Sequence, residues 1–191
     1  MFAATKKPAA QLSLFGAGSP ALEVTRAGDN ESNLWRRRQL MRGLAKHYDK
    51  SYVIGAAGED IAMLDFQAVG GIIARHTGNK RRKCADIGLV YETTGEFACI
   101  EVKTARKTKD GYQFILEKKD RYGATSAKHA DWLLLQCVTP AGAIVRFLLP
   151  MSVVTVSSIR IRNLDTGKYH GYRVKGSCLR SVCSQIFSMG A

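Results

Sequence analysis

Two carboxylates and a lysine stand on two short apolar segments that lie close together in the chain. Asp86 opens the first segment, and Glu101 and Lys103 lie two residues apart in the second. Residues two apart on a strand project from the same face, so Glu101 and Lys103 share one face and Val102 points to the other. Such a group can bind Mg²⁺ and position a water against a phosphate. We therefore expect a site for a hard divalent cation.

A β-hairpin would bring these side chains together. The apolar runs at residues 85–91 and 97–103 are typical of strands, and the polar segment 92–96 between them reads as a turn. Antiparallel pairing then sets Asp86 beside Glu101. The alternative is an ordinary cross-strand ion pair on a solvated sheet face, without catalytic meaning.

The rest of the chain alternates strands and helices. A helix over residues 58–68 would carry Glu59 in its first turn, where the helix dipole favours an anion. Other segments show the apolar pattern of a strand or of an amphipathic helix. Further strands are expected at 72–76, 112–116, 132–138, 143–149, 153–156 and 169–174, and further helices at 33–48, 119–129 and 178–187.

Glu59 on a helix, Asp86 on a strand and Glu101-Val102-Lys103 on its hairpin partner resemble the PD-(D/E)XK nuclease superfamily. The match covers about residues 52–150 and is most similar to archaeal-type Holliday junction resolvases and related small endonucleases. The family has a proline before its aspartate, and this chain has Ala85 there. The resemblance implies an α/β, restriction-endonuclease-like core with a mixed central sheet flanked by helices.

The resemblance also implies roles for the site residues. Asp86, Glu101 and the Val102 carbonyl would bind Mg²⁺, with Mn²⁺ as a substitute. Lys103 would polarise the attacking water and stabilise charge on the phosphate, and Glu59 would complete the shell directly or through water. These four side chains, Glu59, Asp86, Glu101 and Lys103, are the expected catalytic set. The implied reaction is metal-dependent phosphodiester hydrolysis.

The charge of the chain favours a polyanionic partner. Among 191 residues, 29 are Lys or Arg and 16 are Asp or Glu, which leaves a formal charge of +13. We expect DNA, recognised by backbone and shape more than by bases. The alternative for these cations is a generic solubilising surface. The expected DNA-binding residues are Arg36, Arg37, Arg38, Lys80, Arg81, Arg82, Lys83, Arg106, Lys107 and Lys109.

The first 31 residues read as a flexible tail, rich in Ala, Gly and Ser. Within it, Gln11-Leu12-Ser13-Leu14-Phe15 resembles the pentapeptide by which bacterial polymerases and repair proteins dock on the sliding clamp. Leu12, Leu14 and Phe15 would fill an apolar pocket on the clamp, with Gln11 adding a hydrogen bond. The expected organisation is a tail (1–31), a basic helix (32–50), the nuclease core (51–150) and a C-terminal extension (151–191).

The composition of the chain argues against several other classes of protein. No apolar run reaches the length of a membrane span, and residues 1–8 lack the apolar core of a secretory signal. The five cysteines are odd in number and fall mostly in apolar runs, which indicates a reducing cytosol. We expect a cytoplasmic, nucleoid-associated protein. The isolated histidines do not support a Ser/His hydrolase.

The expectation is therefore a Mg²⁺-dependent DNA endonuclease recruited by a sliding clamp. Branched DNA such as a Holliday junction ranks first as substrate, and two symmetric nicks would require a homodimer. A sequence-specific homing or restriction-like endonuclease is the second enzymatic interpretation. The alternative from another class is a non-catalytic module that binds DNA and the clamp.

Overall fold

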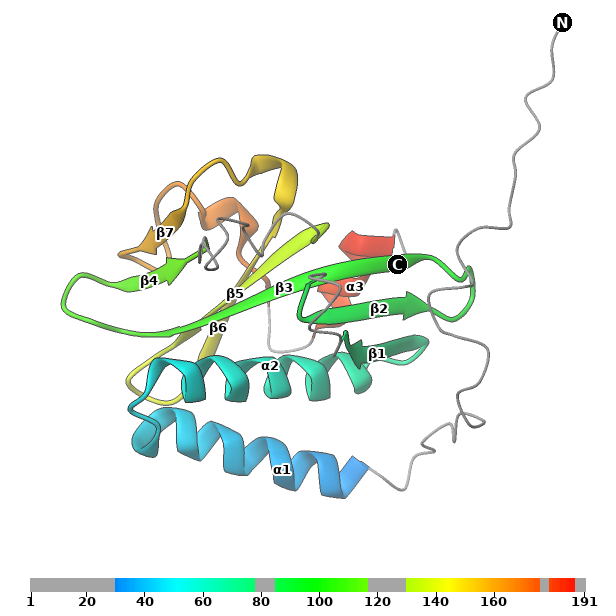
Figure 1. Cartoon of the computed structure of the whole chain (residues 1–191), viewed down its shortest axis with the longest axis horizontal. Coiled ribbons are helices and arrows are strands. Elements are labelled where there is room, and N and C mark those ends of the chain that lie inside the picture. The colour runs from blue at the N-terminus through cyan, green and yellow to red at the C-terminus, as the bar shows by residue number, and fades with distance from the viewer. Residues whose placement is uncertain (1–29, 78–84, 117–129, 176–178, 188–191) are drawn as a thin grey trace, which may run out of the picture.

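The computed structural model describes residues 30–77, 85–116, 130–175 and 179–187 (Figure 1). Three predictions therefore lie outside the described residues: the tail with its clamp-binding peptide, the basic run Lys80, Arg81, Arg82 and Lys83, and the helix at 119–129. None of the helices within the described ranges combines the length and apolar character that a membrane span requires.

A five-stranded mixed sheet forms the centre of the fold. Its order is β1 (Ile72–His76), β2 (Ile87–Tyr91), β3 (Phe97–Arg106), β5 (Trp132–Val138) and β6 (Ile144–Pro150). Neighbouring strands run antiparallel except β3 and β5, which are parallel. The predicted mixed sheet is confirmed, and so is the hairpin that pairs β2 with β3.

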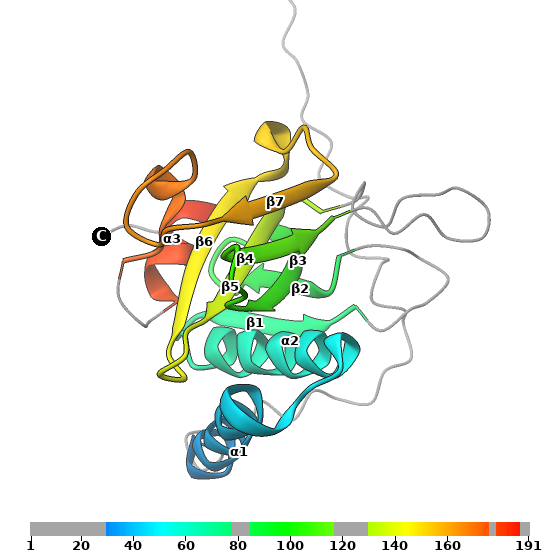
Figure 2. The ribbon, with the colours of Figure 1, turned by 90° about the vertical axis from the view of Figure 1, so that its left-hand side faces the viewer.

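Two apolar cores cover the two faces of this sheet. Figure 2 shows a two-stranded ribbon in front of the sheet. On one face, Val102 and Leu134 pack with Phe66 of α2 (Ser51–Gln67) and Val182 of α3 (Arg180–Phe187). On the other face, residues such as Leu135 pack under a two-stranded ribbon, β4 (Tyr112–Ile115) and β7 (Ser158–Ile161). Strand alternation assigns even-numbered residues of β3 to the helical face and odd-numbered residues to the ribbon face.

The helical layer departs from the predicted boundaries. The first helix, α1 (Asn30–Arg42), continues into a π-helical turn, Gly43–His47, and lies outside α2 in Figure 1. The second, α2, begins at Ser51 and not at residue 58, because Ile54 and Ala57 pack against Leu44 and stabilise turns that local propensity disfavours. Glu59 therefore lies inside the helix, and the helix-dipole argument for it was wrong.

The C-terminal residues are part of both cores. The strand predicted at 153–156 is wrong: the chain forms a 3₁₀ turn, Met151–Val153, and the strand lies at Ser158–Ile161. The segment predicted as a strand at 169–174 is a 3₁₀ turn, His170–Tyr172, followed by a single bridge to Phe147. The predicted final helix is present at Arg180–Phe187.

Candidate active site

Asp86 lies where β2 and β3 separate. The last paired residues of the hairpin are Ile87 and Ile100, so Asp86 stands opposite Glu101 just beyond the ladder. One Asp86 carboxylate oxygen, Oδ2, accepts the Val102 N–H at 2.8 Å, and its backbone carbonyl accepts the Thr77 N–H at 3.2 Å. The Asp86 side chain thus substitutes for the missing strand neighbour of β3. This hydrogen bond holds the carboxylate at the edge of β3.

Glu101 and Lys103 face the ribbon side of β3 and form an ion pair. Glu101 is a buried acid with 4% relative exposure. Burial and the nearby Asp86 charge raise the pKa of Glu101, and Lys103 opposes that shift. Burial would lower the pKa of Lys103, but Glu101, Asp86 and Glu59 outweigh it and raise that pKa. Lys103 is therefore an ammonium ion at neutral pH.

Glu59 reaches this cluster from α2. Partial burial, followed by repulsion from Asp86, raises the pKa of Glu59 to about 7, and the Lys103 and Glu101 charges also act on it. The fold therefore brings all four predicted catalytic residues within electrostatic range of one another. The acidic side chains of this cluster outnumber its one ammonium group, and a bound cation would favour their ionised forms.

The donor set suits a hard divalent cation. Carboxylate and carbonyl oxygens are the ligands that Mg²⁺ prefers. The Val102 carbonyl lies on the same edge of β3 as the Val102 N–H, toward Asp86, because both groups of a strand residue point to the same neighbour. Within the described ranges, no three His, Cys, Asp or Glu side chains are already gathered as a ligand shell. Glu101 would have to exchange Lys103 for the cation.

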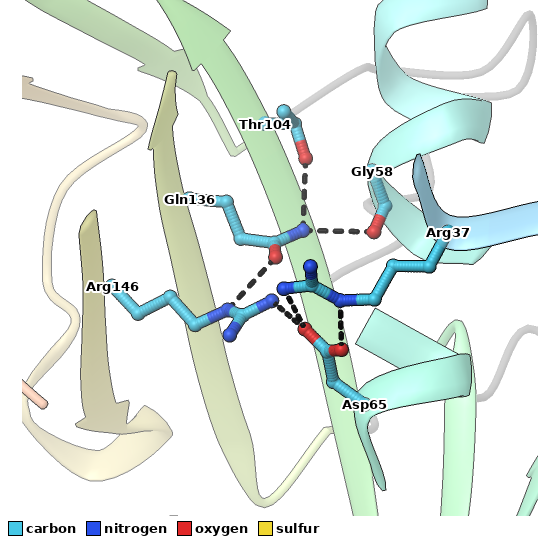
Figure 3. A network of polar contacts seen from close by, with 6 residues as sticks. All are labelled: Arg37, Gly58, Asp65, Thr104, Gln136 and Arg146. Atoms are coloured by element: carbon cyan, nitrogen blue, oxygen red, sulfur yellow. Dashed lines mark hydrogen bonds and ion pairs between the residues drawn. The ribbon is translucent and has the colours of Figure 1, made fainter. Parts of the chain in front are cut away.

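A close approach of α2 to β3 positions Glu59. A Cβ atom at Gly58 would lie 1.8 Å from Thr104 Oγ1, so only glycine allows this contact without a shift. The buried Gln136 amide, from β5, donates to the Gly58 carbonyl at 2.8 Å and to Thr104 Oγ1 at 3.2 Å (Figure 3). The helix turn that carries Glu59 is thereby attached to the sheet.

The same network continues through two arginines (Figure 3). Arg146 on β6 donates from Nε to Gln136 Oε1 at 3.0 Å and pairs with Asp65 of α2. Arg37 of α1 pairs with the other side of Asp65. Burial lowers the pKa of Arg146, and Asp65 opposes that shift. Sequence reasoning missed this network, although Gln136 and Arg146 are visible as polar breaks in apolar strands.

The predicted DNA-binding residues within the described ranges differ in their surroundings. Arg106 donates to the carbonyls of Leu44 and Gly43 at 2.6 and 3.3 Å, and Arg37 is held by Asp65. Both guanidinium groups therefore join elements of the fold. Arg36 pairs with Asp60 at 3.0 Å on the surface. Arg38, Lys107 and Lys109 are exposed as well.

One solved structure shares this architecture. The fold is similar to that of a bacterial homing endonuclease, I-Ssp6803I, with a TM-score of 0.54 and 13% sequence identity. The match covers 73% of this chain and 95% of that chain. No family model matches the chain, and no curated protein does. The chain thus shares the fold of a homing endonuclease at low sequence identity.

Proposed function

We propose that this protein is a metal-dependent DNA endonuclease of the PD-(D/E)XK type. The observation that supports it best is the convergence of Glu59, Asp86, Glu101 and Lys103 at the point where β2 leaves β3. The nuclease-like fold and the +13 charge of the chain agree with this proposal. An ordinary cross-strand ion pair would not require Glu59 as a third acid. Partial burial of this carboxyl group costs free energy, which an ion pair alone does not explain.

Each residue has a separate task in the proposed reaction. Asp86, Glu101 and the Val102 carbonyl would hold Mg²⁺ or Mn²⁺, which neutralises a phosphodiester and lowers the pKa of a neighbouring water when bound. Lys103, released from Glu101, donates a hydrogen bond to the water or to the phosphate oxygen that gains charge. Glu59 orients water from the α2 side.

Cleavage assays on defined DNA test this proposal. Supercoiled plasmid, linear duplex, flap and four-way junction substrates are incubated with Mg²⁺, with Mn²⁺ or with chelator. We expect metal-dependent cleavage by the wild type and loss of cleavage in Asp86→Ala with DNA binding retained. Absence of cleavage on every substrate, with DNA still bound, would favour a non-catalytic DNA-binding module.

The substrate panel also separates two kinds of endonuclease. Resemblance to Holliday junction resolvases favours branched DNA, cut by a homodimer without sequence preference. The fold similarity to a homing endonuclease favours a sequence-specific site on plain duplex instead. Equal cutting of junctions of unrelated sequence supports the first. A discrete cleavage site in a duplex library supports the second.

We further propose that residues 11–15 recruit the enzyme to a bacterial sliding clamp. The support is the sequence Gln11-Leu12-Ser13-Leu14-Phe15 alone. Deletion of residues 11–15 is expected to abolish clamp binding in a pull-down with purified clamp and to leave cleavage of naked DNA intact. Loss of both activities would contradict a separate tether.

A further inference from the structure

A groove of about 310 Å³ runs along the outer edge of β1, between that strand and the two helices α1 and α2. β1 is the edge strand of the five-stranded sheet. The Ala74 carbonyl points into the groove, since the Gln67 side chain donates to it at 3.5 Å. The groove is therefore lined by polar backbone as well as by side chains, in contrast to an apolar docking surface.

The charged side chains of the groove are mostly basic. Arg36, Arg75 and His76 line it together with one acid, Asp60. Asp60 Oδ2 accepts from Arg36 Nη2 at 3.0 Å, and Asp60 Oδ1 lies 3.2 Å from His76 Nε2. One carboxylate thus links a basic residue of α1 to one of β1 across the groove.

These contacts are exposed and so are easily exchanged. The Arg36 side chain is 59% exposed to solvent, and the His76 side chain is 43% exposed. Exposed ion pairs add little stability because water screens them. Another anion of the right geometry can therefore replace Asp60, and arginine binds phosphate oxygens with two parallel hydrogen bonds.

The groove borders the candidate active site. His76 pairs with Ile87 in the β1–β2 ladder, and the Thr77 N–H donates to the Asp86 carbonyl. Since neighbouring strands lie about 4.8 Å apart, His76 is roughly one strand spacing from the start of the catalytic hairpin. On α2, Asp60 follows Glu59 directly. The groove therefore adjoins the start of β2, where the proposed catalytic residue Asp86 stands.

We propose that this groove binds a backbone phosphate of the substrate DNA next to the phosphate that is cleaved. Arg36 and His76 contact that phosphate, and Asp60 occupies both side chains until the DNA arrives. This inference rests on the proposed DNA endonuclease function and adds to it a specific subsite. It assigns Asp60 a specific inhibitory role in DNA binding. A generic basic surface would give this acid no such role.

The test is a binding titration of a labelled duplex by fluorescence anisotropy at several salt concentrations, without divalent cation so that no cleavage occurs. Arg36→Gln is expected to weaken binding and to reduce the slope of log K against log salt by about 0.9, the value for one lost phosphate contact. Asp60→Asn is expected to bind several-fold tighter than the wild type. Arg160→Gln and Glu92→Gln, which change exposed charges outside the groove, are the matched controls.

A double-mutant cycle distinguishes occupancy from long-range charge. If Asp60 acts by holding Arg36, the gain from Asp60→Asn shrinks in the Arg36→Gln background. Additive effects, an unchanged salt slope in Arg36→Gln, or equal gains in Asp60→Asn and Glu92→Gln would each overturn the subsite. If any of these outcomes is found and the wild type still cleaves DNA, only the phosphate subsite in the groove is refuted. A wild type that does not bind DNA at all refutes the proposed function as well.

Discussion

Removal of the Asp65 carboxylate is expected to be among the most destabilising single changes in the described part of this chain. Asp65 pairs with Arg146 and Arg37, which come from the sheet and from α1. The Arg146 side chain is only 5% exposed, Asp65 is 12% exposed and Arg37 is 29% exposed. Asp65→Ala therefore leaves one deeply buried guanidinium without its carboxylate.

The magnitude follows from that burial. Breaking a buried pair by removing one partner costs about 3–5 kcal/mol, and a domain of this kind has roughly 5–15 kcal/mol in all. Arg37→Gln removes only the more exposed partner and leaves Asp65 paired with Arg146, so about 1 kcal/mol is expected. The double change Asp65→Leu with Arg146→Met removes both buried charges and should recover most of the loss.

Chemical denaturation in urea, followed by tryptophan fluorescence and circular dichroism, measures these differences. We expect the order wild type, Arg37→Gln, the double variant and then Asp65→Ala, from most to least stable. An Asp65→Ala protein within about 1 kcal/mol of the wild type would refute the reasoning. So would an Arg37→Gln protein as unstable as Asp65→Ala.

Three further outcomes follow from the site geometry. Gly58→Ala should cost about 1–3 kcal/mol in urea denaturation because the new Cβ meets Thr104 Oγ1 at 1.8 Å, and Thr104→Gly in the same chain should restore part of that loss. The pKa of Glu59 is raised to about 7, so its protonated form stabilises the fold; this contribution is complete below the ordinary value of 4.5 and is lost as pH rises through 7. Without divalent cations, the melting temperature of the wild type should fall across pH 4.5–7 more steeply than that of Glu59→Gln, and parallel curves would contradict the shift. Lys103→Met should lower the cleavage rate on the order of 10²-fold while DNA binding is kept, because a donor to the reacting phosphate is lost; an unchanged rate would remove Lys103 from the reaction.

The elements around the candidate site were largely predictable because their signals are local. Two short apolar runs on either side of a polar turn predict the β2–β3 hairpin, and that hairpin sets Asp86 beside Glu101. The strand Trp132–Val138 was predicted with its observed bounds, since a continuous apolar run marks a strand buried on both faces.

The remaining features depend on contacts that a local pattern does not contain. The early start of α2 depends on Ile54 and Ala57 packing against Leu44, a residue of the preceding turn. Gln136 and Arg146 could be recognised as polar residues in apolar strands, but not paired with Gly58 and Asp65. Those pairs require knowing that α2 crosses this face of the sheet.

The side-chain partners of the acids were also beyond sequence reasoning. Asp86 turns toward the Val102 N–H because β2 and β3 diverge there, and that divergence has no signature in either strand. The Asp60 contacts have the same origin, since Arg36 and His76 both reach Asp60 only because α1 and β1 pack against α2. The sequence therefore identifies the acidic residues of the candidate site, whereas their hydrogen-bond and ion-pair partners follow only from the tertiary structure.

Titration of the protein with Mn²⁺, followed by isothermal calorimetry, tests most directly whether the carboxylates beside β3 hold a divalent cation. We predict saturable binding by the wild type and by the control Glu92→Gln, and loss of that binding in Asp86→Asn and in Glu101→Gln. Equal Mn²⁺ binding by all four proteins, or none by the wild type, would contradict a metal site formed by Asp86 and Glu101.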